Sequence, residues 1–248
     1  MKTNKVQKRP LNGLLLLIAL LFSNFLTAQV FIENHPGGNA KDPTIMIWLS
    51  DGLQKRIPYE NIKGSPFWSD EWKPATLYGE TSKELWLCKT KLNLATGEVY
   101  YMDNQNNEMV ATPGLIKKIV FHKEGDTGIT SAVFIYNYQA LQLNNQTVNV
   151  YLQVLNEGKY QLLKLHNRKV SSADSMFGTL KRYYFSDEIK YFVAQDRKTE
   201  PVKKLNKENI LAYFPVSSLY SDWVAQNKID FRKEEQVVAF FNYYNSKN

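Results

Sequence analysis

The sequence is poor in the two residue types that most often bind metals or form cross-links. Its 248 residues include one cysteine, Cys88, and three histidines, His35, His122 and His166. A single cysteine excludes an internal disulfide, so packing alone must stabilise the fold. No two histidines have metal-ligand spacing on one element, and neither His-Glu-x-x-His nor Cys-x-x-Cys occurs. We therefore predict no metal site and no cofactor.

The sequence also lacks the common catalytic motifs. It contains no Gly-x-Ser-x-Gly element, which marks the nucleophile of many hydrolases. The polar turn at residues 103–108 begins like a calcium-binding loop, but Gln105 occupies its third position and Glu108 its sixth, where glycine is needed. These patterns assign no catalytic residue.

Beyond its first residues, the chain has no concentration of charge of one sign. The sequence has 31 basic and 24 acidic residues, a net charge of +7. Four of the basic residues lie within residues 1–28, which hold no acidic residue, so their removal leaves 27 basic against 24 acidic residues, or +3. Because nucleic-acid binding needs a concentrated basic surface, we expect no nucleic-acid partner.

The hydrophobic run near the N-terminus is short. A basic segment at residues 2–9 precedes it, residues 14–22 are apolar, and small or polar residues follow as far as Ala28. This order is typical of a secretory signal peptide, and the run is well short of the roughly 20 residues of a membrane-spanning helix. We predict a signal peptide at residues 1–28 and a flexible segment at residues 29–44. The mature chain is then exported, periplasmic or secreted, without a transmembrane span. An uncleaved anchor is the alternative.

Beyond residue 45 the apolar residues recur mostly with the period of two that β-strands show. We predict an antiparallel β body at residues 45–204, shaped as a roll, a sandwich or a partly open barrel, with hairpin turns at residues 95–98, 156–158 and 186–188. Cys88 shares one face of a predicted strand with Trp86 and Leu92, which predicts a buried, unreactive thiol.

The last fifth of the chain changes to helical spacing. Residues 205–248 are predicted to form a cap of two or three short helices, with Asn206, Ser218 and Asp230 as N-caps. The predicted fold class is therefore α+β, with a predominantly antiparallel sheet body.

Three segments and the C-terminal tail have a familiar combination. The segments are IKGSPFWSDEW at residues 62–72, LNLATGEVYYMDNQNNEMVATPGLIKKIVF at residues 92–121 and LQVLNEGKYQLLKLHNRKV at residues 152–170, and the tail is AFFNYYNSKN. Together they resemble a family of secreted β-rich proteins of the Bacteroidetes with a Gly-Ser-Pro-aromatic turn, a hairpin body and a helical tail. The resemblance implies export and a β-rich body, and it supplies no activity and no catalytic residues.

The segment KGSPFWSDEWKP at residues 63–74 holds the candidate ligand-binding residues. Trp68 and Trp72 lie four positions apart, with Asp70 and Glu71 between them. A short helical turn would place both rings on one face and both carboxylates in water, so we interpret the rings as packing residues that anchor a turn to the core. The alternative is an aromatic platform for a sugar or peptide, with the carboxylates as polar contacts.

The missing catalytic patterns, the signal peptide and the β-rich body favour a non-enzymatic binding or structural module of the cell envelope. Its partner would be an envelope glycan or protein. A secreted glycan or peptide hydrolase with carboxylates on different strands is the alternative from another class. A third alternative is a small barrel that carries an apolar ligand.

Overall fold

The computed structural model describes most of the chain beyond residue 43. The described ranges are 44–48, 54–80, 84–138, 141–143, 146–147, 149–174, 181–196, 198–215 and 218–247. The predicted signal peptide lies outside them, as does all of the predicted flexible segment except Thr44. Within the described ranges, no helix is both long and apolar enough to cross a bilayer.

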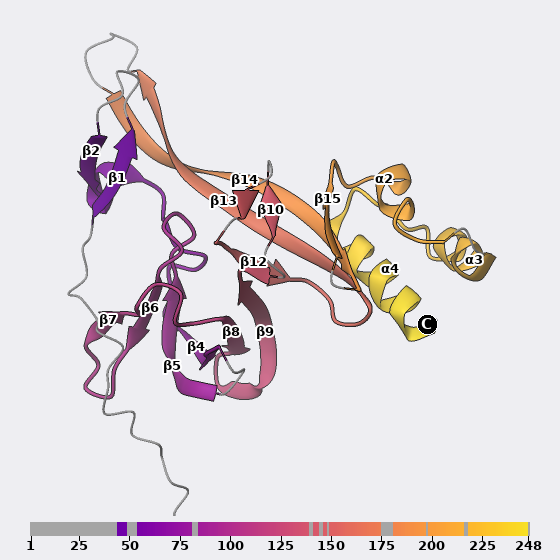
Figure 1. Cartoon of the computed structure of the whole chain (residues 1–248), viewed down its shortest axis with the longest axis horizontal. Helices are drawn as coiled ribbons and strands as arrows, with labels where there is room; N and C mark the ends of the chain where they lie inside the picture. Colours follow the sequence, from indigo (N-terminus) through magenta and orange to yellow (C-terminus); the bar gives the residue numbers. More distant parts are fainter. Residues whose placement is uncertain are drawn as a thin grey trace, which may run out of the picture. The chain divides into compact units, whose positions relative to one another are not determined.

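One large sheet dominates the described residues (Figure 1). Its strands are β3 (Ile62–Lys63), β4 (Lys73–Tyr78), β5 (Glu84–Leu92), β6 (Val99–Met102), β7 (Glu108–Val110), β8 (Lys118–Lys123), β9 (Asp126–Tyr136), β12 (Tyr151–Val154), β13 (Tyr160–Asp174), β14 (Lys181–Gln195) and β15 (Lys198–Val202). Apart from β3, their order is β15-β14-β13-β12-β9-β8-β4-β5-β6-β7, so the described sheet is open, with β15 and β7 at its ends. The α+β class with a mainly antiparallel sheet is confirmed.

Short strands complete the β structure. β1 (Thr44–Trp48) pairs with β2 (Gln54–Pro58), and β10 (Gln142–Leu143) pairs with β11 (Gln146–Thr147). After a 3-10 turn, η1 (Tyr59–Asn61), β3 joins the edge of β14 in parallel, with Ile62 opposite Tyr183. This parallel pair is an exception to the predicted antiparallel pattern, and it leads the chain directly into the Gly-Ser-Pro turn.

β13 and β14 form a long two-stranded ribbon. Their register runs without a shift from the Tyr160–Gln195 pair to the Asp174–Lys181 pair. The predicted hairpin turn at residues 186–188 is therefore wrong, because β14 is one continuous strand. Residues that favour turns are held in the strand by cross-strand partners, since the Ser186 hydroxyl lies 2.8 Å from that of Ser171.

Aromatic side chains from the helical tail fill the core at one end of the ribbon. The helices are α2 (Lys207–Leu211), α3 (Ser218–Gln226) and α4 (Glu234–Lys247). Phe240, Phe241 and Tyr244 of α4 are buried in the same cluster as Tyr160 and Leu162 of β13. Burying such large rings stabilises this part of a chain that has no disulfide.

Two further buried clusters lie within the sheet. One contains Leu77, Phe121 and Phe134 with other residues of strands β4 to β9, and the other contains Leu163 and Phe192 of the ribbon. The strands thus bury alternate side chains on both faces of the sheet near the ribbon.

The predicted helix caps are partly correct. Asn206 caps α2, because its Oδ1 accepts a hydrogen bond of 2.8 Å from the Asn209 N–H. Asp230 does not cap α4, which begins at Glu234. The Asp230 carboxylate instead accepts hydrogen bonds from the backbone N–H and the guanidinium of Arg232, which hold an extra turn before the helix.

Candidate functional site

Trp68 is part of the core of the sheet. Its ring lies 4.7 Å from the Phe121 ring and 5.3 Å from the Phe134 ring, measured between centroids. Its backbone N–H donates to the Leu92 carbonyl oxygen at 2.9 Å, and the Leu94 N–H donates to the Pro66 carbonyl oxygen at 2.8 Å. The Gly-Ser-Pro turn is therefore bound to the last residue of β5 and to Leu94 just after it. The half-buried Trp68 ring packs as a core residue.

Trp72 does not share a face with Trp68. The segment between them forms bends rather than the predicted helical turn, because the backbone of Trp68 is bound to β5. The Lys91 ammonium lies over the Trp72 ring, 5.1 Å from the ring centroid. The side chain of Lys91 leaves β5 on the face opposite to the buried Leu92. The two rings thus do not form one platform.

The two candidate carboxylates of this segment point to solvent. Asp70 and Glu71 are both exposed, and the Glu71 carboxylate lies 3.3 Å from the Lys73 ammonium. Exposed pairs of this kind contribute little to stability. Of the four candidate residues, the structure brings Trp68 and Asp70 to one hollow.

Arg168 of β13 joins this turn to the ribbon. Its Nε and Nη2 donate to the two carboxylate oxygens of Asp187 on β14, at 2.9 and 2.7 Å. Its Nη1 donates to the carbonyl oxygens of Ser65 and Phe67, at 2.8 and 2.5 Å. Hydrogen bonds to a charged group are stronger than neutral ones. We call this arrangement the arginine clamp.

A shallow hollow of about 450 Å³ lies beside the arginine clamp. The residues that line it are Ser65, Phe67, Trp68, Asp70, Arg168, Phe185 and Asp187. We call it the clamp hollow. Hydrogen bonds from Arg168 hold the pKa of Asp187 below its usual range, so this carboxylate is ionised at neutral pH. An ionised carboxylate has no proton to give to a substrate, and both oxygens of Asp187 already accept hydrogen bonds from Arg168.

His166 lies between two ion pairs on the same face of the ribbon. Lys164, His166 and Arg168 alternate along β13, and the Lys164 ammonium lies 2.8 Å from the carboxylate of Glu234 on α4. The Nε2 of His166 is 2.9 Å from the Gln153 side-chain oxygen. Burial lowers the pKa of His166, and the charges of Lys164 and Arg168 lower it further, against the opposite effect of Asp187 and Glu234. The ring is therefore neutral near pH 7.

Glu234 connects the helical tail to this row. Its Oε2 accepts a hydrogen bond of 2.5 Å from the Tyr191 hydroxyl as well as the ion pair with Lys164. Burial raises the pKa of Glu234, but the bonds from Lys164 and Tyr191 outweigh it and the net shift is downward. The row of charges thus holds α4 on the ribbon rather than presenting a free acid or base.

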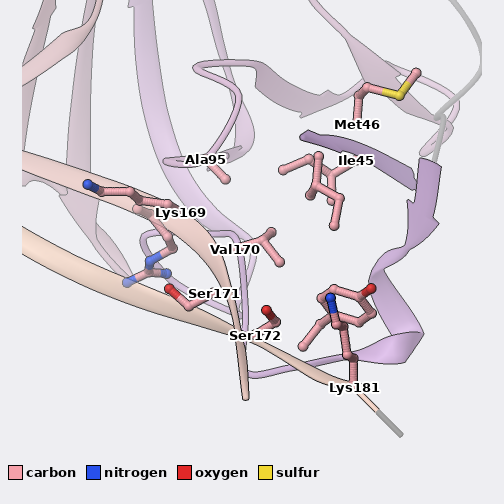
Figure 2. A pocket seen from close by; sticks show the side chains of 11 residues that line it. Ile45, Met46, Ala95, Lys169, Val170, Ser171, Ser172 and Lys181 are labelled. Atoms are coloured by element: carbon pink, nitrogen blue, oxygen red, sulfur yellow. The ribbon is translucent and has the colours of Figure 1, made fainter. Parts of the chain in front are cut away.

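A second hollow, of about 350 Å³, lies between β1 and the part of the ribbon formed by residues 168–172 of β13 and residues 181 and 183 of β14. We call it the edge hollow. It is lined by apolar residues, basic residues and hydroxyls, namely Ile45, Met46, Ile47, Ala95, Val170, Arg168, Lys169, Lys181, Ser171, Ser172 and Tyr183. In Figure 2, Ile45 and Val170 point into the hollow from opposite sides and Met46 points away. Its described lining contains no Asp, Glu, His or Cys.

Cys88 and His122 are embedded in the sheet. The Cys88 thiol is half-buried beside the core rather than fully buried as predicted, and burial raises its pKa to about 11 against a smaller opposite effect of Thr90, which disfavours the thiolate at neutral pH. The Nε2 of His122 lies 2.8 Å from the Thr76 hydroxyl. Over the described residues, no group of three or more His, Cys, Asp or Glu side chains is placed to bind a metal.

Comparison with known proteins adds no assignment. No family model, no curated protein sequence and no solved structure matches the chain. The resemblance to a Bacteroidetes family stays a prediction, and the site must be interpreted from its own geometry.

Two features of the site escape sequence reasoning. The alternation of Lys164, His166 and Arg168 within a predicted strand signals a charged strip on one face, and it could have drawn attention to the arginine clamp. The edge hollow has no sequence signal of this kind, because β1 and the ribbon that line it are more than a hundred residues apart.

Proposed function

We propose that the protein is an exported, non-enzymatic binding module of the bacterial cell envelope, with the edge hollow as its ligand site. The observation that supports this most is the lining of that hollow. Catalytic acids and bases are most often histidines and carboxylates, nucleophiles are most often thiols and activated hydroxyls, and Lys and Tyr are used less often. The described lining of the hollow offers an apolar wall, lysines, an arginine and hydroxyls, and it contains no carboxylate, histidine or thiol.

The serines of the edge hollow also fit a binding role. A catalytic serine needs a base within hydrogen-bonding reach. The Ser171 hydroxyl bonds to that of Ser186, at 2.8 Å. Among the described side chains, neither Lys169 nor Lys181 makes a hydrogen bond to a serine of the hollow. A Ser–Lys catalytic pair is therefore not assembled there.

A glycan or peptide hydrolase is the second candidate, and the clamp hollow favours it. Asp70 and Asp187 both line this hollow, and they come from different elements, as the two carboxylates of a glycosidase do. Asp187 is ionised and accepts two hydrogen bonds from Arg168, so it cannot act as the general acid. Asp70 would have to fill that role.

The proposal is tested by expressing the full-length gene product in the cells that produce it. The cells are fractionated, and binding of the purified protein to the isolated envelope is measured. We expect an N-terminus at Gln29 and co-sedimentation with the isolated envelope. The double variant Ile45→Asp/Val170→Asp should abolish co-sedimentation, while Glu71→Ala, a surface change outside both hollows, should not. Retention of the unprocessed chain in the cytoplasm would contradict the proposal. Release of sugar or peptide products by the wild type, lost in Asp70→Asn, would establish the hydrolase instead.

A further inference from the structure

Among the described residues, one edge of β13 has no strand partner over much of its length. β13 pairs with β14 throughout, but its pairing with β12 covers only Leu163 and Lys164. Beyond these residues, within the described chain, no strand pairs with the other edge. An unpaired strand edge presents a row of backbone N–H and C=O groups that can pair with another chain.

The hydrogen bonds of Leu162 reveal which backbone groups face this edge. The Leu162 carbonyl oxygen accepts from the Leu155 N–H at 2.9 Å, and the Leu162 N–H donates to the Asn156 side-chain oxygen at 2.7 Å. Both groups therefore point away from β14. Because the register has no shift and backbone groups alternate in direction along a strand, the even-numbered residues share this orientation. Arg168, Val170 and Ser172 thus present their N–H and C=O groups at the open edge.

The edge hollow lies along this part of β13. Five consecutive residues of β13, 168–172, line it, and so do three consecutive residues of β1, 45–47. Side chains of neighbouring strand residues point to opposite faces, so a hollow that contacts consecutive residues follows the edge of a strand. Ile45 and Val170 face the hollow from its two sides (Figure 2). Tyr183 and Lys181 of β14 also line the hollow, so it runs from the open edge of β13 over the ribbon face that carries Val170 and Ser172, with β1 as its apolar wall.

The charge around the hollow is positive. Arg168, Lys169 and Lys181 line it, and Lys55 of β2 lies 5.7 Å from the ring centroid of Tyr183, which also lines it. Arg168 and Lys169 pair with Asp187 and Glu188. Among the described side chains, neither Lys55 nor Lys181 lies within ion-pair distance of a carboxylate. This excess of positive charge favours an acidic occupant.

We propose that the edge hollow binds an extended, acidic peptide segment of a partner protein, which adds as a strand to the open edge of β13. The backbone of Arg168, Val170 and Ser172 supplies the hydrogen bonds. An apolar side chain of the peptide packs between Val170 and Ile45, and its carboxylates face Lys181 and Lys55. Strand addition gains affinity from backbone pairing and specificity from alternate side chains. The inference rests on the proposed function, because it names the ligand of the same site.

Peptide binding to the full-length exported protein tests this inference. The probe is a peptide of alternating Val and Glu residues with fluorescein on its N-terminus, fluorescein-Val-Glu-Val-Glu-Val-Glu-Val-Glu-amide. We expect saturable binding by fluorescence anisotropy, weakened at least about tenfold when alternate amides of the probe are N-methylated, because each lost pairing removes backbone hydrogen bonds. The same peptide with Lys in place of Glu should not bind. High salt should weaken binding of the Glu probe.

Protein variants separate the backbone from the side chain. Val170→Pro removes one edge N–H and leaves the β14 ladder intact, since proline is tolerated on a strand edge whose N–H faces solvent. We expect it to weaken binding of the Glu probe at least about tenfold, and Val170→Ala, which keeps the N–H, to weaken it less. Lys181→Glu should weaken binding, whereas Lys207→Glu, on an exposed residue of α2, should not. Unchanged thermal melting of each variant verifies that it folds.

Three results would overturn the inference. The first is equal binding of the N-methylated probe, and the second is unchanged binding by a folded Val170→Pro variant. The third is concentration-dependent dimerisation lost in Val170→Pro without probe binding, which would identify a second copy as the occupant. If the probe fails while envelope co-sedimentation still depends on Ile45 and Val170, the peptide inference fails and the proposed binding function stands. If the wild type neither co-sediments with the envelope nor binds the probe, both the proposed function and the peptide inference are contradicted.

Discussion

The guanidinium of Arg168 and the carboxylate of Asp187 form a two-point hydrogen-bonded pair across the ribbon, with N–O distances of 2.9 and 2.7 Å. The same guanidinium holds two carbonyl oxygens of the Gly-Ser-Pro turn. The Arg168 side chain therefore binds its register partner on β14 and the Gly-Ser-Pro turn. It also lines both hollows.

The arginine clamp should contribute measurably to stability. Arg168→Met keeps much of the aliphatic stem but leaves Asp187 and two carbonyl groups without their donor. We expect a loss of about 1–3 kcal/mol in the free energy of unfolding by urea. Lys169→Ala is the matched control from the next position, because its pair with Glu188 is exposed, and it should leave the urea midpoint unchanged. Equal midpoints for Arg168→Met and the wild type would contradict a structural clamp.

Trp68 should behave as a core residue. Trp68→Ala removes ring contacts with Phe121 and Phe134, and we expect a cost of about 3–5 kcal/mol in the free energy of unfolding, as for other large aromatic residues in a core. Glu71→Ala, three positions along in the same segment, should change it by less than about 0.5 kcal/mol. Thermal melting of both variants checks this. Unchanged melting of Trp68→Ala with lost ligand binding would favour the aromatic platform.

The stability of the protein should fall as the solution is acidified below about pH 6.5. His166 has a depressed pKa in the folded state, so the unfolded chain binds its proton at a higher pH. The stabilisation is full above the unfolded value of about 6.5 and is lost as pH falls through the folded value. His166→Gln should therefore flatten the dependence of the urea midpoint between about pH 7 and pH 5. An identical pH profile for the variant and the wild type would exclude His166 as the cause.

The hairpin tip between β12 and β13 depends on the last helix. Gly158 has a φ of +119°, and a Cβ there would lie 2.5 Å from the Asn245 side-chain nitrogen. The Asn245 side chain accepts from the Tyr160 N–H at 3.0 Å and donates to the Glu157 carbonyl oxygen at 2.9 Å. We expect Gly158→Ala to cost about 1–3 kcal/mol in urea unfolding, because it combines backbone strain with a displaced Asn245.

A glycine without such a neighbour provides the control for the hairpin tip. Gly97 also has a positive φ, +73°, but nothing lies within 4 Å of the position of its Cβ. Gly97→Ala should therefore cost less than Gly158→Ala, because it makes no clash and because a φ of +73° lies closer to the left-handed region that other residues can adopt. Equal losses for the two variants would contradict a cost from the clash with Asn245.

Local sequence patterns predict much of the fold. Apolar residues with a period of two predict the strands, the aromatic helical pattern predicts the tail, and Asn206 predicts a cap that is present. The hairpin with its tip at residues 156–158 is also present. These features depend on neighbours in the chain, which is why residue types and spacing are enough to indicate them.

The sequence by itself determined that the chain forms an antiparallel, disulfide-free β body with a helical tail, because strand and helix periodicities record which side chains avoid water. Only the tertiary structure decided that residues 186–188 continue a strand, that Arg168 binds a carbonyl oxygen 103 positions away, and that, among the described strands, none pairs with the edge of β13 beside β1. The physical reason is that cross-strand pairing and carbonyl capture are contacts between distant segments, and their energies override local turn preferences.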